Sequence, residues 1–151
     1  MNQFQRTELL IGKEGLKKLQ EAHVIIFGIG GVGGYVVEAL ARSGVGELTL
    51  VDSDNVSLTN LNRQIIATHE TIGQSKVHVM AKRIASINPA CKVHQKQIFF
   101  LPDNQEQFDF YIYDYVVDAV DTVSAKISLV LQAQAVNTPI ISSMGTGNKL
   151  N

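Results

Sequence analysis

The chain has 151 residues, 45% of them hydrophobic and 18% charged, and carries a formal net charge of −1 at pH 7. This length suits one domain with a sizeable core, no apolar run approaches the about 18 residues of a membrane span, and a single cysteine, Cys91, excludes an internal disulfide. The near-neutral charge gives no electrostatic footprint for nucleic acid, and the polar N-terminus, without an apolar signal segment, makes the cytoplasm the expected location.

Strand-like and helix-like segments alternate along the chain. Short β-branched runs are typical of strands buried in a parallel sheet, and apolar residues at helical spacing predict helices. The expected elements, in order, are helix 13–21, strand 23–28, helix 32–43, strand 47–52, helix 75–87, strand 92–99, strand 114–119, helix 122–136 and strand 139–143. This alternation predicts an α/β fold: a Rossmann-like, doubly wound, mainly parallel sheet with helices on both faces.

The apolar residues of two helices predict the face that each one buries. In helix 75–87, which Asn88-Pro89 ends, the expected inward residues are Val77, Met80, Ala81, Ile84 and Ile87. In helix 122–136 they are Val123, Ile127, Val130 and Leu131.

A glycine-rich loop joins the first expected strand to the helix that follows it. Gly28, Gly30 and Gly33 match the G-x-G-x-x-G spacing, and Gly31 lies among them. Glycines there allow a tight turn, close approach of the backbone to phosphate, and packing of the helix on the strand. The helix N-terminus adds free N–H groups and a positive dipole end. The loop therefore predicts a nucleotide-phosphate site.

The residues after the second strand indicate which nucleotide is bound. Asp52 lies about 20 residues past the loop, the place of an acid that accepts hydrogen bonds from ribose hydroxyls, and up to this point NAD and ATP fit equally well. The segment from Asp54 to Gln64 contains Asn60 and Arg63. It favours ATP, because a fixed Arg fork stabilises the charge that grows on a triphosphate attacked at phosphorus, whereas a hydride-transfer cofactor does not need it.

Two further charged residues complete the predicted site. Lys76 starts the next helix, where its charge would meet the same phosphates, although an ordinary solvated lysine fits this position as well. Asp121 follows the carboxyl end of a strand, where ligands collect in open sheets, and is expected to hold the Mg²⁺ that bridges the phosphates. Asp118, inside the strand, is expected to be structural.

Six motifs in register carry a resemblance to a known family. They are Gly28-x-Gly-Gly-Val-Gly33, Asp52-x-Asp54-x-Val56, Asn60-x-Asn-Arg-Gln64, Gly73-x-x-Lys76, Ile87-Asn-Pro89 and Asp118-x-x-Asp121. Over nearly its whole length, the chain resembles the adenylating family of ThiF, MoeB and the ubiquitin-activating enzymes. Segments 6–15, 117–126 and 141–150 are similar to its tRNA threonylcarbamoyladenosine dehydratase branch, which has Thr or Ser after the aspartate at position 121, where sulfur-carrier activators usually have Asn.

The resemblance implies ATP-dependent adenylation of a substrate carboxylate, that of threonylcarbamoyladenosine in tRNA, which then closes to a ring with loss of water. It also implies a homodimer in which Arg6 reaches the ATP of the partner subunit, although the sequence alone indicates an exposed terminal arginine. The implied ATP-binding residues are Gly28, Gly30, Gly31, Gly33, Asp52, Asp54, Asn60, Arg63, Gln64 and Lys76. The implied catalytic residues are Arg63, Lys76, Asp121 and Arg6, with Mg²⁺ on Asp121.

Two other functions remain open on the sequence. An activator of a sulfur-carrier or ubiquitin-like protein would share the first half-reaction. A sulfur-relay protein is a further expected partner of the protein. An NAD-binding or nucleotide-sensing module would leave Arg63, Lys76 and Asp121 without a role. Cys91 lacks the electropositive niche of an activated thiol, and the four histidines lack metal-ligand spacing.

The last residues suggest how the chain relates to a complete domain. Residues 142–151 are expected to form a glycine-bearing loop after a strand, and members of the family that the chain resembles continue beyond such a point. The chain, residues 1–151, is therefore expected to be the N-terminal ATP-binding part of a ThiF-type adenylation domain.

Overall fold

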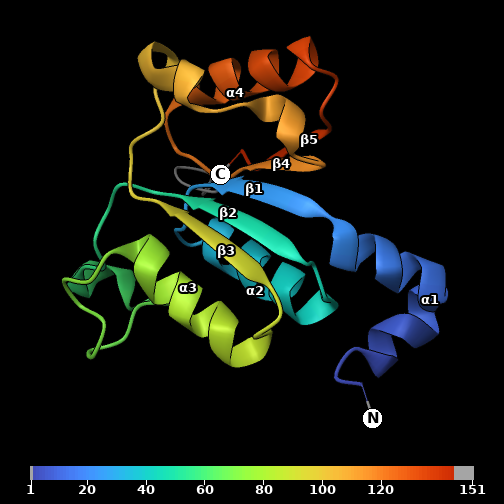
Figure 1. The fold of residues 1–151 in the computed structure, drawn as a ribbon. Helices are drawn as coiled ribbons and strands as arrows, with labels where there is room; N and C mark the ends of the chain where they lie inside the picture. The colour runs from blue at the N-terminus through green and yellow to red at the C-terminus, as the bar shows by residue number, and fades with distance from the viewer. Residues whose placement is uncertain (1, 145–151) are drawn as a thin grey trace, which may run out of the picture.

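Five parallel strands form one sheet in the order β3-β2-β1-β4-β5 (Figure 1). The computed structural model describes residues 2–144. The strands are β1 His23–Phe27, β2 Glu47–Val51, β3 Lys92–Lys96, β4 Tyr115–Asp118 and β5 Ile140–Ser142. β1 pairs with β2 on one side and β4 on the other, so the strand order reverses beside β1, as in a doubly wound sheet.

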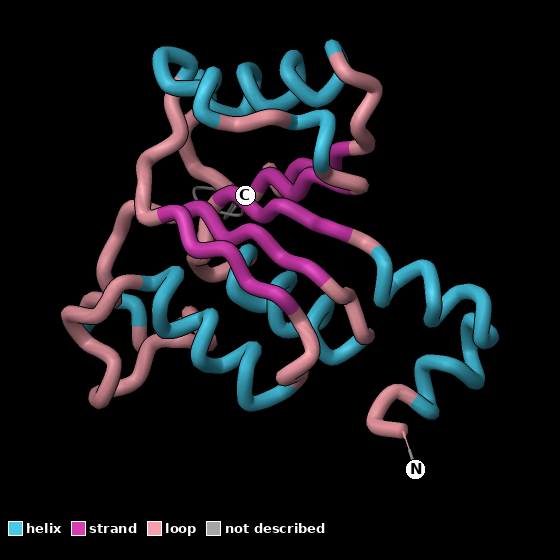
Figure 2. The backbone as a smooth tube through the Cα atoms, viewed as in Figure 1, coloured by secondary structure: helices cyan, strands magenta, loops and turns pink. Residues whose placement is uncertain are grey.

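Helices cover both faces of the sheet, as predicted (Figures 1 and 2). The helices are α1 Gln5–Glu21, α2 Gly33–Ser43, α3 Lys76–Ile87 and α4 Val123–Ala135, and the 3₁₀ turns are η1 Leu58–Asn60, η2 Pro102–Gln107 and η3 Phe110–Ile112. α2 and α3 pack on one face with β1 and β2, whereas α4 and the η2–η3 segment enclose an aromatic core on the other. No helix in residues 2–144 is both long and apolar enough to cross a membrane.

The first helix begins earlier than predicted. α1 starts at Gln5 and bends at Gly12, whose φ of +75° is left-handed. Its first half exposes Leu9 and Leu10 to solvent. Because this half carries no apolar stripe that faces a core, helical periodicity does not reveal it.

The predicted buried face of α4 is wrong, whereas that of α3 is confirmed. In α4 the residues that pack on the sheet are Ala125, Ser128, Leu129 and Ala133, and three of the expected inward residues, Val123, Ile127 and Leu131, are exposed. The aromatic core explains the difference: small residues let α4 approach the rings of Phe27 and Phe110 closely. In α3, Val77, Met80, Ala81 and Ile84 are buried, and Ile87 is partly buried at the margin of the core between α2, α3 and the sheet.

The third strand is shorter than predicted. β3 ends at Lys96, because the next residues leave the sheet: the Gln97 side chain donates a hydrogen bond to Asn55 Oδ1, and Phe100 enters the aromatic core. The Phe100 ring lies 5.0 Å from that of Phe27 in an edge-to-face contact. Residues 98–100 are thereby brought over the carboxyl end of β1.

An ion-pair cluster joins α2 to α3. Glu38 is buried on α2, and its carboxylate accepts hydrogen bonds from Arg42, one turn on, and from Arg83 on α3, whose Nη2 lies 3.0 Å from Oε1. The hydrogen bond from Arg83 lowers the pKa of Glu38, against the opposing effect of burial.

Replacing Glu38 by Gln is expected to lower the free energy of unfolding at pH 7 by about 1–3 kcal/mol, because two arginines lose a charged acceptor. The folded-state pKa lies below the unfolded value of about 4.3. The stabilisation is therefore present above that pH and is lost as the pH falls through the folded-state pKa. Urea unfolding of both proteins near pH 7 and near pH 3 measures the difference, and an equal difference at both pH values would contradict the assignment.

Candidate functional site

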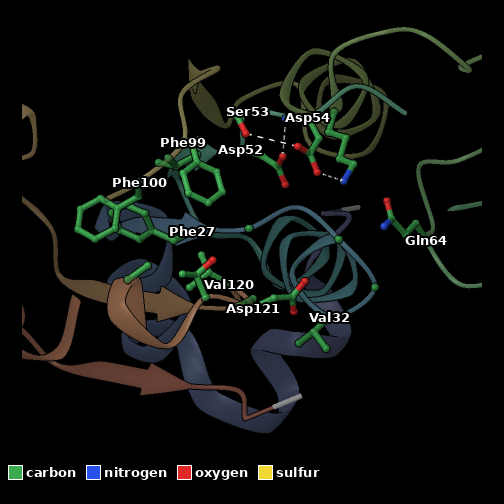
Figure 3. A pocket seen from close by; sticks show the side chains of 18 of the residues that line it. Phe27, Val32, Asp52, Ser53, Asp54, Gln64, Phe99, Phe100, Val120 and Asp121 are labelled. Carbon is green, nitrogen blue, oxygen red and sulfur yellow. Dashed lines mark hydrogen bonds and ion pairs between the residues drawn. The ribbon is translucent and has the colours of Figure 1, made fainter. Parts of the chain in front are cut away.

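A cavity of about 630 Å³ opens at the carboxyl ends of β1, β2 and β4 (Figure 3). Ligands of open parallel sheets bind beyond the carboxyl ends of the strands where the strand order reverses, which here is between β1 and β4. The volume of the cavity lies within the range of about 300–1,000 Å³ typical of small-molecule sites. The predicted residues that line it are Gly28, Gly30, Gly31, Asp52, Asp54, Asn60, Arg63, Gln64, Lys76 and Asp121.

Two glycines of the loop are required by the fold itself. Gly28 has a φ of +90°, and a Cβ on it would lie 2.5 Å from the carbonyl oxygen of Ala119. A Cβ on Gly33, at the start of α2, would lie 1.7 Å from the carbonyl oxygen of Gly28. Gly33 does not line the cavity; it lets α2 begin directly against the turn, which holds the helix N-terminus behind the loop.

At Gly30 and Gly31, by contrast, no contact within the described residues requires a glycine. A Cβ on Gly30 would lie 3.7 Å from Gln64 Nε2, and one on Gly31 would lie 3.6 Å from Arg63 Cγ, both ordinary contacts. Neither glycine has a positive φ. Both line the cavity, so the absence of a side chain leaves room for a ligand to approach the backbone.

Asp52 fixes the loop as well as facing the cavity. Its Oδ2 accepts a hydrogen bond from the Ile29 N–H at 2.7 Å, and its Oδ1 accepts one from the Asp54 N–H at 2.8 Å. The carboxylate thus joins the end of β2 to the glycine loop. The ribose contact inferred from the sequence stays a prediction, and the free lone pairs of the two oxygens are available for it.

Lys76 is a buried residue of the cavity, so the solvated-lysine alternative is wrong. Only 5% of the residue is exposed, and its Nζ lies 3.0 Å from Asp54 Oδ2. An antiparallel bridge between Asn55 and Ser75 brings these distant parts of the sequence together. A buried ammonium next to a mostly exposed carboxylate is well placed to pair with an anion that enters the cavity.

The Asn/Arg/Gln cluster forms one wall of the cavity. Asn60 is buried, and its Oδ1 accepts a hydrogen bond from the Ser57 N–H, which caps the η1 turn. Arg63 is exposed and donates from Nη1 to the carbonyl oxygen of Thr59 at 3.0 Å.

Gln64 has an unusual environment in this wall. It is buried beside Gly30, and within residues 2–144 its Oε1 has no hydrogen-bond partner. Such a buried amide oxygen costs free energy unless a ligand or water supplies a donor. Figure 3 shows the Gln64 side chain in the part of the cavity that also holds Asp54. The wall thus offers a charged fork and an unsatisfied amide.

The remaining predicted residues lie in different places. Asp121 is exposed on the loop after β4 and lines the cavity. Asp118 is fully buried and pairs with Lys126 at 3.1 Å, which agrees with its expected structural role. Arg6 is exposed on α1, which precedes the amino end of β1, and it is absent from the lining of the cavity (Figure 1).

Sequence reasoning missed the apolar end of the cavity. Phe99, Phe100 and Val120 form it, away from Gln64 (Figure 3). The sequence placed residues 92–99 in a strand, and only the turn out of the sheet after Lys96 brings the two phenylalanines over the carboxyl end of β1. An apolar flat-walled end and a polar end suit a ligand with an aromatic base and an anionic tail.

Cys91 lies outside this cavity, before β3. Burial raises the pKa of its thiol to about 11, and Glu47 adds to the effect. The thiol is therefore protonated at neutral pH, which agrees with the expectation that it is not an activated nucleophile.

The sequence of this chain is similar to those of known proteins. The model of the ThiF family matches residues 4–149. The tRNA threonylcarbamoyladenosine dehydratase of Bacillus subtilis is 50% identical over 149 residues, which cover 99% of this chain and 59% of that protein. A sulfur carrier protein adenylyltransferase of Thermus thermophilus is 31% identical over 143 residues, 93% of this chain and 52% of that protein.

Solved structures give the same result. The structure of the E. coli tRNA N6-threonylcarbamoyladenosine dehydratase TcdA in complex with ATP superposes with a TM-score of 0.94 at 41% identity, covering 99% of this chain and 61% of that one. The predicted α/β fold is therefore confirmed. The chain spans little more than half the length of these two curated relatives. The predicted loop after Ser142 falls largely on residues 145–151, outside the described residues.

Proposed function

The chain belongs to the ThiF family, and from this premise we propose that it takes part in ATP-dependent adenylation of a carboxylate, that of threonylcarbamoyladenosine in tRNA. Support for this substrate comes from the 50% identity to a dehydratase of that name over 99% of the chain. The Asp121-Thr122 pair, which the sequence shares with that branch, points the same way.

The observation that carries the proposal is the polarity of the cavity. One end holds the buried ammonium of Lys76 and the guanidinium of Arg63, both of which attract phosphate. The other end is walled by Phe99 and Phe100. ATP has the matching chemistry: an aromatic base at one end and a triphosphate at the other.

The polar end offers the groups that adenylation requires. When a carboxylate attacks the α-phosphorus and pyrophosphate leaves, two anions meet and negative charge grows on the phosphate oxygens. Lys76 would hold the phosphates as a buried point charge, and Arg63 would donate to the oxygens on which charge develops. Asn60 and Gln64 would orient the phosphate oxygens. The backbone of Gly30 and Gly31 would approach the phosphates without a side chain in the way.

Asp121 fits the Mg²⁺ expected from the sequence. Its carboxylate lies at the cavity and, within the described residues, accepts no hydrogen bond that would occupy its oxygens. Oxygen ligands of this kind are those that Mg²⁺ prefers. The ion would neutralise part of the phosphate charge there.

In the second half of the proposed reaction, the activated acyl group closes to a ring. The carbamoyl group of the same nucleoside attacks the acyl carbon, AMP leaves, and the net change in the nucleoside is the loss of one water.

Further parts of the proposal concern partners and location. We propose a homodimer in which Arg6 reaches the nucleotide of the partner subunit, since Arg6 is exposed on α1 and does not line the cavity of its own subunit. A sulfur-relay protein is a further proposed partner, and the cytoplasm is the proposed location. Size-exclusion chromatography with light scattering tests the dimer.

A second candidate, activation of a sulfur-carrier protein, is favoured by the match to the Thermus thermophilus adenylyltransferase at 31% identity. It uses the same adenylation chemistry in the same cavity. The third alternative, an NAD-binding module, leaves the buried Lys76 and the polar wall unexplained.

Nucleotide titration is the first test of the proposal. We expect the chain to bind ATP at least about tenfold more tightly than NAD, because one buried cation next to a triphosphate contributes more than about 1.4 kcal/mol. Equal affinities, or tighter binding of NAD, would refute the ATP site.

The acyl substrate is tested separately. The chain, and a chimera in which it replaces the matching residues of the Bacillus subtilis dehydratase, are incubated with ATP, Mg²⁺ and tRNA that carries threonylcarbamoyladenosine. Nucleoside mass spectrometry is expected to show the loss of one water that depends on ATP. An unchanged nucleoside, with pyrophosphate exchange stimulated by a Gly-Gly-tailed protein, would move the function to sulfur-carrier activation.

A further inference from the structure

Three side chains with metal-binding atoms meet at the end of the sheet remote from the nucleotide cavity. They are His23, Glu47 and His94, and their nearest ligand atoms all lie within 4.8 Å of one another. His94 Nε2 lies 2.7 Å from Glu47 Oε1, and His23 Nδ1 lies 3.7 Å from the same oxygen. The spacing of the histidines in the sequence gives no metal-ligand pattern, and only the fold brings His23 and His94 together.

Strand register holds the three residues together. His23 and Glu47 are the first residues of β1 and β2 and are paired directly. His94 lies on β3 opposite Thr49, two residues after Glu47 on β2 and so on the same face of the sheet. Because the residues stand on three adjacent hydrogen-bonded strands, their backbones are fixed relative to one another, unlike those of a loop cluster.

A fourth residue orients the first imidazole. The Nε2 atom of His23 lies 2.8 Å from Thr49 Oγ1, and Thr49 is almost fully buried. When Nδ1 of a neutral imidazole binds a metal, the ring proton is on Nε2, and here Thr49 Oγ1 would accept it. Metal-binding histidines generally have such a partner on their second nitrogen.

We propose that His23 Nδ1, Glu47 Oε1 and His94 Nε2 bind one zinc ion, with a fourth position open to water. Two imidazoles and one carboxylate form a donor set that zinc favours, whereas Mg²⁺ and Ca²⁺ favour oxygen alone. Tetrahedral zinc with bonds of about 2.0–2.1 Å separates its ligand atoms by about 3.3 Å. His23 Nδ1 and Glu47 Oε1, 3.7 Å apart, are already near this spacing, whereas His94 Nε2 is only 2.7 Å from Glu47 Oε1, so the half-exposed His94 side chain has to shift for both histidines to bind the ion.

This site is separate from the nucleotide site. β1 runs five residues from His23 to Phe27, about 13–16 Å at the usual rise of a strand, and the glycine loop follows its far end. A zinc ion here would not reach the phosphates. It would cross-link β1, β2 and β3 near their amino ends and stabilise the folded sheet.

Binding to the tag-free, metal-depleted chain tests the proposal. Titration with Co²⁺, followed by the visible absorption of tetrahedral cobalt and then by zinc competition, is expected to show one site per chain. Replacing Glu47 by Gln or His94 by Ala should each weaken binding at least about tenfold. A zinc concentration 100-fold above its Kd should raise the Tm of the unmodified chain by about 5–10 °C.

His78→Ala is the matched control, because His78 is exposed on α3 and lies outside the cluster. It should leave the affinity and the Tm increase unchanged. Both cluster positions chosen for substitution are partly exposed, so both variants should retain the fold, which far-UV circular dichroism checks. The proposal fails if no saturable 1:1 binding occurs, or if Glu47→Gln and His94→Ala bind zinc as tightly as the unmodified chain.

Discussion

Replacing Arg63 by Ala is expected to reduce ATP–pyrophosphate exchange about a thousandfold, with the fold unchanged. The guanidinium faces the cavity and, among residues 2–144, donates to two exposed acceptors, the Thr59 carbonyl and Asn62 Oδ1. Removing it therefore leaves no buried group unpaired. In the proposed reaction, however, the substitution removes the guanidinium that binds the phosphate oxygens as charge grows on them.

Two variants sharpen this prediction. Arg63→Lys keeps the charge but loses the fork, and should recover only part of the rate. Lys82→Ala, which removes an exposed cation of α3 outside the cavity, should exchange like the unmodified chain. Exchange is measured in the presence of the tRNA substrate, and melting temperature reports the fold. Unmodified exchange in Arg63→Ala would remove this residue from the mechanism.

Substitutions at two glycines of the same loop should have opposite consequences. Gly33→Ala is expected to destabilise the protein by more than about 4 kcal/mol, a large part of a typical stability of 5–15 kcal/mol, because the new Cβ would lie inside the van der Waals radius of the Gly28 carbonyl. Gly30→Ala should change stability by no more than about 1 kcal/mol, because its Cβ has room and its φ is allowed.

Gly30, whose substitution should hardly change stability, is the glycine at which a side chain should weaken ATP binding. Gly30→Ala should weaken ATP binding at least about tenfold, because the methyl group occupies the space through which the phosphates would approach the backbone. Urea unfolding and ATP titration of both variants measure the two effects. A Gly30→Ala protein that binds ATP like the unmodified chain would place the phosphates elsewhere in the cavity.

Much of the fold and of the candidate site was predictable from local sequence. The glycine spacing identified the turn between β1 and α2, because only glycine tolerates the φ of Gly28 and the close approach at Gly33. Asp52, Asp54 and Asp121, which follow the carboxyl ends of β2 and β4, line the cavity as expected, because the carboxyl ends of neighbouring parallel strands lie at one edge of the sheet.

Long-range packing decided the rest. α4 has apolar residues on more than one side, so its sequence alone does not say which side packs; the aromatic core selects the side with the smallest residues. Burial of Lys76 depends on the bridge between Asn55 and Ser75, and the apolar end of the cavity depends on the point where β3 leaves the sheet.

The sequence by itself thus determined the order of strands and helices along the chain, the glycine loop and the polar residues of the candidate site, because these depend on neighbours within a few positions along the chain. Only the tertiary structure decided which face of α4 is buried and that His23, Glu47 and His94 come together. The physical reason is that strand register and side-chain volume join residues far apart in sequence, and neither leaves a periodic pattern in the sequence.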